Sequence, residues 1–331
     1  MIELVDTSSS EIAAEFVRAR RRAGSPAMGM VMTLVIVADE DDADRAMEVA
    51  RSTAREHPAR ILGVVVGPRR GPSQVDAQVG IGSGAGERAL IRLTGEVTRH
   101  AASVVLPLLL PDSPVVVWWP GRAPDDPAAD PLGALGTRRI TDAASAPSGK
   151  AKAMLTQCTS YSPGNTDLAW TRITGWRALL AAALDQNPGK VESASVTAER
   201  ISPSADLLSA WLGDRLRCHV ERHNSAGPGI TRVVLTTAQG DVTISRTDGR
   251  LATLCSPGEP DRPVALKRRD LDELLSEELR RLDPDDVYAD TVQRMARTGS
   301  REAPAKGTTG RGGKAKGAGA KSAAGRTPKR S

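Results

Sequence analysis

The sequence is poor in aromatic residues, cysteine and histidine. Its 331 residues include one Phe, two Tyr and five Trp, so aliphatic side chains must form most of the core. The three cysteines, Cys158, Cys218 and Cys255, show no CxxC spacing. A sparse, odd set of this kind is typical of a reducing compartment and argues against a disulfide framework. Four histidines provide few general bases for a Ser or Cys nucleophile.

Long hydrophobic runs are also missing. The most apolar stretch, 104–119, is interrupted by Pro107, Pro111 and Pro114. It is shorter than the roughly 20 residues that cross a bilayer as a helix. The first residues lack the basic-then-apolar order of a signal peptide. We therefore expect a cytoplasmic protein with no membrane contact.

The net charge of +5 is unevenly distributed along the chain. Residues 300–331 carry nine Lys or Arg against the single Glu302, so residues 1–299 have a net charge of −3. The segment 300–331 has no large apolar residue to bury, and we expect a disordered basic tail. Such a tail would bind polyanions weakly and without sequence preference, because it lacks aromatic rings that stack on bases.

The first half of the sequence has the pattern of an α/β domain. The apolar runs 30–38 and 61–67 are typical of strands buried on both faces, and a helical pattern begins at the acidic cluster 39–44 between them. A strand, a helix and a strand in this order predict a parallel pair. We therefore predict an α/β domain with a mostly parallel sheet over residues 1–150.

The second half, 151–299, has a different pattern. Ser202–Pro203 is the expected start of a helix. Asp248–Gly249 is a hairpin turn signal between two short strands. The predicted strands lie at 192–198, 216–222, 230–237, 241–247 and 250–255. Leucines from Leu271 to Leu282 and a later apolar pattern predict two C-terminal helices. We expect an α+β domain with an antiparallel sheet.

Three patterns suggest ligand sites, and each has a simpler explanation. Gly80, Gly82 and Ala85 match G-x-G-x-x-A, but the following residues alternate like a strand and offer no helix N-terminus to a pyrophosphate. His219 and His223 also lie in a strand pattern, which places them roughly 13 Å apart, too far for one zinc ion. The cluster 39–44 is favourable at a helix N-terminus. We predict a hairpin loop at the glycine pattern, a solvated strand face at the two histidines and a helix start at the acidic cluster. We predict no metal, cofactor or catalytic residue.

Tryptophan is the residue whose placement is unusual. Trp118 and Trp119 are adjacent at the end of a predicted strand, so their rings point to opposite faces. Trp and Arg are enriched in interface hot spots. Each Trp taken alone is equally well explained as a core residue. We predict exposed partner-binding residues in two clusters: Trp118, Trp119, Pro120, Trp170, Arg172, Trp176 and Arg177.

Several stretches together resemble one known family. They are TLVIVADEDDA (33–43), REHPARI (55–61), SVVLPLLLPDSPVVVWWPG (103–121), DPLGALGTRRITDAA (130–144) and YSPGNTDLAWTRITGWRALLAAALD (161–185). The sequence resembles the OpcA-type assembly proteins of glucose-6-phosphate dehydrogenase, in order from the N-terminus to about residue 298. The basic tail has no counterpart in this resemblance.

The resemblance implies a non-catalytic accessory protein that binds glucose-6-phosphate dehydrogenase and promotes its active oligomer. It identifies no functional residue, so the interface candidates rest on composition alone. Two alternatives stay open. One is a nucleotide- or sugar-phosphate-binding enzyme with its pocket at the ends of strands 30–38 and 61–67. The other is a nucleic-acid-associated protein that acts through the basic tail.

Overall fold

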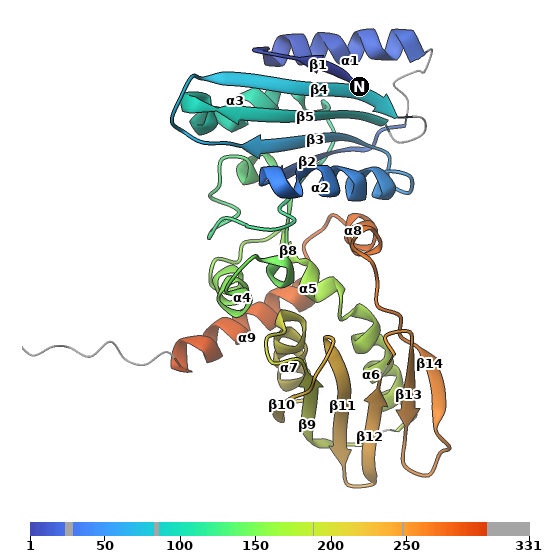
Figure 1. Cartoon of the computed structure of the whole chain (residues 1–331). Helices are drawn as coiled ribbons and strands as arrows, with labels where there is room; N and C mark the ends of the chain where they lie inside the picture. The colour runs from blue at the N-terminus through green and yellow to red at the C-terminus, as the bar shows by residue number, and fades with distance from the viewer. Residues whose placement is uncertain (24–28, 83–85, 188, 247, 303–331) are drawn as a thin grey trace, which may run out of the picture.

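The chain forms two sheets that lie at opposite ends of the molecule, with several helices between them (Figure 1). The computed structural model describes residues 1–23, 29–82, 86–187, 189–246 and 248–302. In these residues, no helix combines the length and the apolar composition needed to cross a membrane. The basic tail was predicted from residue 300. Its residues 303–331 lie outside the described part of the chain.

The first sheet has eight strands. Six of them, adjacent to one another across the sheet, run parallel, as predicted. From β5 to β8 every pair is parallel, while β1 and β4 are antiparallel additions at one edge. In spatial order the strands are β1 (Ile2–Leu4), β4 (Gln74–Gly82), β5 (Gly86–Thr94), β3 (Ala59–Val66), β2 (Met32–Ala38), β6 (Val115–Trp118), β7 (Arg138–Thr141) and β8 (Asn165–Asp167). The sequence did not predict β7 or β8. Strand β8 joins this sheet although it follows the domain boundary predicted at residue 150.

Both faces of the first sheet are covered because its central strands are apolar on both sides. Val35 of β2 packs with α1 and α3, whereas Leu34 and Ile36 pack with α2 and α8. The four helices are α1 (Ser9–Ala23), α3 (Ala101–Val105), α2 (Glu40–Thr53) and α8 (Leu271–Leu279). Short 3-10 turns η1 (Gly95–His100) and η2 (Leu106–Leu108) flank α3. Helix α8 comes from the C-terminal part of the chain, so the two halves are interleaved.

The second sheet is mostly antiparallel, as predicted. Only β9 and β10 pair in parallel. In spatial order its strands are β10 (His219–Asn224), β9 (Val191–Ala198), β11 (Ile230–Thr237), β12 (Gly240–Ser245), β13 (Leu251–Cys255) and β14 (Arg262–Ala265). At the predicted turn after β12, the Asp248 carboxylate accepts hydrogen bonds from the backbone N–H groups of Arg250 and Leu251. Strand β14 was not predicted.

Helices cover one face of the second sheet and build its core. They are α4 (Lys150–Thr159), α5 (Leu168–Thr171), α6 (Thr174–Gln186), α7 (Pro203–Arg215) and α9 (Asp286–Glu302), with 3-10 turns η3 (Gly133–Leu135) and η4 (Ala143–Ser145) earlier in the chain. As predicted, Ser202 caps α7 by accepting a hydrogen bond from the Ala205 N–H group, and Pro203 is its first residue. Helix α9 continues to Glu302, past the boundary predicted at residue 299, because adding a residue to an existing helix costs little.

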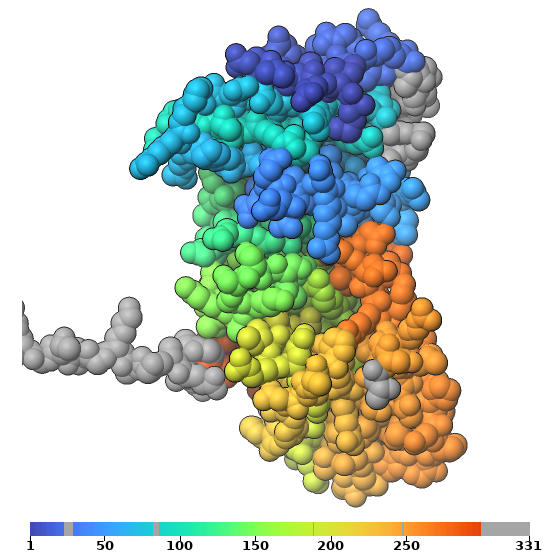
Figure 2. Space-filling model, viewed as in Figure 1, coloured from blue at the N-terminus to red at the C-terminus, as the bar shows by residue number. Residues whose placement is uncertain are grey.

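The other face of the second sheet has no helix over it in the described residues. In Figure 1 this face is turned toward the viewer and α6 lies behind the strands, and Figure 2 shows the same strands at the front of the molecule. Val233 and Leu235 point into the core, so Val234 between them points outward. The outward side chains of the central strands include the short residues Ser193, Ser195, Thr197, Val234, Thr236, Thr253 and Cys255. The longer side chains of Arg232, Leu251, His219, Glu221 and His223 lie on the same face.

Candidate functional site at the junction of the two sheets

Trp118 and Trp119 point to opposite faces of the first sheet, as their adjacency predicted. Trp118 packs on the side of α2 and α8, and Trp119 packs on the side of α1 and α3. Both rings are buried, with exposed fractions of 0% and 2%. Pro120, which follows them, is buried as well. The expectation that these residues are exposed is therefore wrong for the free chain, because helices cover both faces of this sheet.

Trp170 and Trp176 are also inside the molecule, in the core shared by α4–α7, α9 and the second sheet. The Trp170 indole N–H donates to the Asp285 carboxylate at 2.9 Å, and the Arg177 guanidinium lies 3.6 Å from the centre of its ring. Burial lowers the pKa of Arg177 to about 10. Trp170 and Arg177 of the predicted cluster are therefore in contact, and both of its indoles are buried. Trp176 instead contacts Arg246, whose guanidinium lies 5.2 Å from its ring centre.

Arg172 retains some exposure and holds a buried carboxylate. Its two terminal nitrogens donate to the two oxygens of Asp142 at 2.6 and 2.8 Å, and the Asp142 side chain has no exposed surface. Planar bidentate pairing of this kind fixes orientation as well as charge. Asp142 directly follows β7, and Arg172 follows α5. The pair therefore ties the carboxyl end of the first sheet to the helices beneath it.

Asp167, at the carboxyl end of β8, is a second buried carboxylate beside this pair. It accepts hydrogen bonds from the Thr141 hydroxyl at 2.6 Å and from the backbone N–H groups of Ala143 and Ala169 at 2.9 and 2.8 Å. Burial, and then the neighbouring Asp142 charge, raise the pKa of Asp167. These bonds all stay within the chain, so Asp167 positions the backbone around Asp142.

A third buried contact joins β7 to the returning C-terminal segment. Arg138 forms an ion pair with Glu278 of α8 and donates to the Asp283 carbonyl at 2.7 Å. Glu278 also accepts a hydrogen bond from the Thr171 hydroxyl at 2.7 Å. Sequence reasoning did not single out Arg138, Asp142 or Glu278. The available signal was that Arg138 lies within a short strand and Asp142 directly follows it. Their partners, Glu278 and Arg172, are distant in sequence and could not be identified from this signal.

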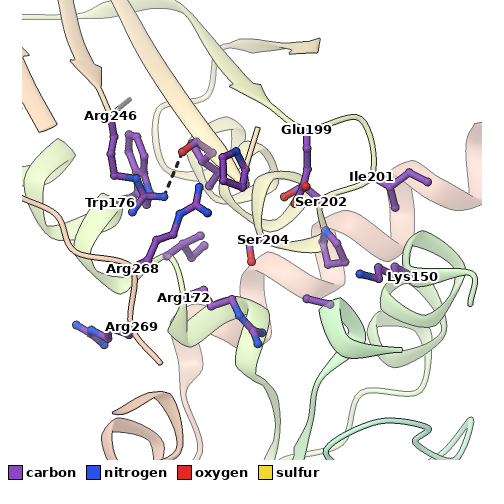
Figure 3. Close-up of a pocket in the computed structure, with 16 residues that line it drawn as sticks. Lys150, Arg172, Trp176, Glu199, Ile201, Ser202, Ser204, Arg246, Arg268 and Arg269 are labelled. Atoms are coloured by element: carbon purple, nitrogen blue, oxygen red, sulfur yellow. Dashed lines mark hydrogen bonds between the residues drawn. The ribbon is translucent and has the colours of Figure 1, made fainter. Parts of the chain in front are cut away.

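Two cavities flank the Asp142–Arg172 pair. One of about 280 Å³ lies at the carboxyl ends of β6 and β7 and is lined by Arg122, Asp142 and Lys152 among others. The other, of about 250 Å³, lies on the Arg172 side at the N-terminus of α7 (Figure 3). Ligands of open α/β sheets bind outside the carboxyl ends of the strands. The cavity at β6 and β7 has this position, whereas the cavity at α7 lies against the second sheet.

The other candidate patterns have the structures that the simpler explanations predicted. Gly80 and Gly82 lie in β4, whose register pairs Gly82 with Gly86 in a hairpin, and residues 83–85 are outside the described part of the chain. His219 and His223 are exposed on strand β10. The acidic cluster begins α2, with Asp39 at the N-cap position. Burial raises the pKa of the Cys158 thiol, which disfavours the reactive thiolate.

Family models match most of the described chain. A model of the glucose-6-phosphate dehydrogenase subunit N-terminal domain matches residues 50–159, and one of its C-terminal domain matches residues 163–292. The chain belongs to the OpcA-type family of glucose-6-phosphate dehydrogenase assembly proteins. The two OpcA-type domain models meet between α4 and β8, at the junction built by Asp142 and Arg172. No curated protein sequence matches the chain.

Solved structures with similar architecture are distant from this OpcA-type chain. They include the 3-ketoreductase KijD10 from Actinomadura kijaniata with NADP and TDP-benzene (9% identity, TM-score 0.45, covering 81% of this chain and 96% of that one). An oxidoreductase from Sinorhizobium meliloti has 11% identity and a TM-score of 0.41, covering 82% and 90%. Biliverdin reductase from Synechocystis has 12% identity and a TM-score of 0.38, covering 81% and 98%. At these scores the likeness supports no functional conclusion.

Proposed function

We propose that this chain is a non-catalytic cytoplasmic factor that binds glucose-6-phosphate dehydrogenase and promotes its active oligomer. The observation that carries the proposal is the match of both OpcA-type domain models, in order, over most of the described residues. The ion pairs Arg138–Glu278 and Asp142–Arg172 each join one matched region to the other, which supports the idea that the two halves act as one unit.

The absence of catalysis is supported by how the charged groups of the junction are used. Asp142 is held by Arg172 and the Ser145 hydroxyl, and Asp167 accepts three internal hydrogen bonds. A general base must reach the proton of a substrate, and these carboxylates are directed at the chain itself. The glycine pattern that suggested dinucleotide binding lies in a hairpin and offers no helix N-terminus.

We further propose that the uncovered face of the second sheet contacts the dehydrogenase. With the indoles buried, the predicted set Trp118, Trp119, Pro120, Trp170, Arg172, Trp176 and Arg177 offers a partner only parts of its arginines. The outward Ser, Thr and Val side chains of this face lose little side-chain entropy on contact. Val234 lies near its centre, and Leu251, 55% exposed, lies on β13, two strands away.

Binding at this face would act on the dehydrogenase by shifting its population between states. A partner that binds the active oligomer more tightly than the inactive form stabilises the active one by its differential affinity, and by no more than that. Our proposal therefore needs no residue of this chain inside the dehydrogenase active site.

The test uses both purified full-length proteins from the same organism. Light scattering after size exclusion measures the mass of the dehydrogenase with and without the chain, and a coupled assay measures NADPH formation. We expect a larger complex, a higher specific activity, and no turnover of glucose 6-phosphate by the chain alone. Unchanged mass and unchanged activity would reject the assembly role, whereas turnover by the chain alone would favour the enzyme alternative.

A further inference from the structure

The cavity at the N-terminus of α7 gathers positive charge from distant parts of the chain. Its wall includes one lysine at the start of α4, an arginine after α5, another at the end of β12, and two in the segment before α8: Lys150, Arg172, Arg246, Arg268 and Arg269. Glu199 is the one acidic residue in this lining. Figure 3 shows the arginines on one side of the cavity, facing Glu199, Ser202 and Lys150. The elements are brought together only by the fold.

These cations are incompletely neutralised by the chain. Arg172 pairs with Asp142, and Arg269 lies 3.8 Å from Glu277. In the described residues, Lys150, Arg246 and Arg268 form no salt bridge with a carboxylate. Two or more unpaired positive charges around one cavity repel each other unless an anion enters.

Arg246 shows that the cavity is built and not a chance gathering of surface side chains. Its exposed fraction is 7%, and it is held by the carbonyl oxygens of Leu266 and Ile230 at 3.0 and 3.2 Å. Its Nε is buried without a hydrogen-bond acceptor. Burial, and then the charge of Arg268, lower the pKa of Arg246 to about 10. The two carbonyl groups and the Trp176 ring stabilise this cation in part, but it has no carboxylate partner, so a bound anion would add favourable charge pairing.

The helix end and the neighbouring hydroxyls add donors for an anion. Helix α7 has 13 residues and its N-terminus, at Ser202–Pro203–Ser204, lines the cavity. Pro203 has no N–H group and the Ala205 N–H group is paired with Ser202, so this helix end offers the Ser204 N–H group together with the positive dipole end, which favours phosphate. Ser204 contributes a hydroxyl to the same wall. Guanidinium groups bind phosphate oxygens through paired hydrogen bonds.

We propose that this cavity binds the phosphate group of a small phosphate monoester, such as a sugar phosphate. A volume of about 250 Å³ is slightly below the about 300–1,000 Å³ of typical ligand pockets, so it suits a small ester better than a dinucleotide. Three unpaired cations match a phosphate dianion better than a single carboxylate. The site lies apart from the uncovered sheet face and gives the assembly factor a means of sensing a small anion.

Calorimetric titration of the full chain, in the absence of the dehydrogenase, tests this site. The probes are glucose 6-phosphate, inorganic phosphate and unphosphorylated glucose, each at low and high salt. We expect glucose 6-phosphate to bind more tightly than inorganic phosphate, with an affinity that falls with salt, and glucose to give no heat. Equal affinity for glucose 6-phosphate and inorganic phosphate would overturn the proposal that the ligand is a monoester. Binding of unphosphorylated glucose without binding of either phosphate would overturn the proposal that the site binds an anion.

The variant Arg268→Gln locates the binding. The Arg268 side chain makes no hydrogen bond or ion pair in the described structure, so its loss should leave the fold intact. We expect its affinity for glucose 6-phosphate to fall at least about tenfold, the size of one charge-assisted hydrogen bond. Arg232→Gln, an exposed arginine on the other side of strand β11 from the core, is the matched control and should bind as the parent chain does.

Equal weakening in both variants, or none in Arg268→Gln, would overturn the proposal. The proposal would also be overturned if the chain bound an acidic peptide at this site and did not bind phosphate esters, because the cavity would then be a protein-docking site. None of these measurements involves the dehydrogenase, so their failure leaves the assembly role standing.

Discussion

Arg138 of β7 forms a buried ion pair with Glu278 of α8, across 140 residues of chain. The pair is closed on one side by the Thr171 hydroxyl and on the other by the Asp283 carbonyl. Through it the C-terminal segment, after completing the second sheet, returns to cover the first. The interleaving of the two halves depends on such contacts as much as on the apolar packing of Leu274, Leu275 and Leu279 against β2 and β6.

Removing one partner of this pair should cost much more than removing an exposed neighbour. Glu278→Ala leaves Arg138 buried and unpaired, and we expect the free energy of unfolding to fall by about 3–5 kcal/mol. Glu277→Ala, one residue earlier, removes partly exposed pairs with Arg269 and Arg280 and should cost about 1 kcal/mol or less. Urea unfolding of both variants measures the difference. Equal losses would mean that the buried pair contributes no more than a surface pair.

Trp119 should behave as a core residue in the free chain. Trp119→Ala removes a ring that packs with α1 and α3, and we expect a loss of about 3–5 kcal/mol of stability. Leu106→Ala, at a side chain that is 57% exposed, should change stability by less than about 0.5 kcal/mol. Thermal unfolding measures both. If Trp119→Ala keeps the parent melting temperature, the ring is not part of the core.

Asp167 predicts a specific dependence of stability on pH. Its carboxyl pKa is raised above 3.8 by burial first and by Asp142 second. The folded chain therefore holds this proton more tightly than the unfolded chain. The resulting stability is complete below the unfolded pKa and is lost as the pH rises through the folded one.

The variant Asp167→Asn cannot titrate at this position, so its comparison with the parent chain isolates the contribution of Asp167 to stability. The free energy of unfolding of the parent chain, minus that of the variant, should decrease as the pH rises from about 4 toward neutrality. Urea unfolding of the parent chain and the variant at a series of pH values measures this difference. An increasing difference for Asp167→Asn would show that its pKa is lowered.

Elements with local signals could be predicted from the sequence. Strand β11 was expected at the residues where it occurs, 230–237. This run, ITRVVLTT, is rich in β-branched residues, which favour strands. The start of α1 also has a local signal, because Ser8 and Glu11 form a capping box, in which each side chain bonds the backbone N–H group of the other residue. Here the local chemistry alone determines the structure.

Elements that depend on distant partners could not be predicted. Strand β7 contains two buried arginines, and Arg138 is tolerated there only because Glu278 arrives from the far end of the chain. The burial of Trp118 required α8 to return to the first sheet, which no pattern around Trp118 indicates. The cationic cavity was missed for the same reason, since Lys150 and Arg268 are 118 residues apart.

The affinity of the dehydrogenase for two lysine variants tests most directly whether the uncovered sheet face is the contact surface. Val234→Lys places a long charged side chain in the middle of that face, whereas Val17→Lys places one at a 39% exposed position on α1. With folding verified by circular dichroism, we expect Val234→Lys to weaken binding at least about tenfold, or about 1.4 kcal/mol, and Val17→Lys to bind normally. Normal binding by Val234→Lys, or a loss confined to Val17→Lys, would contradict the proposed surface.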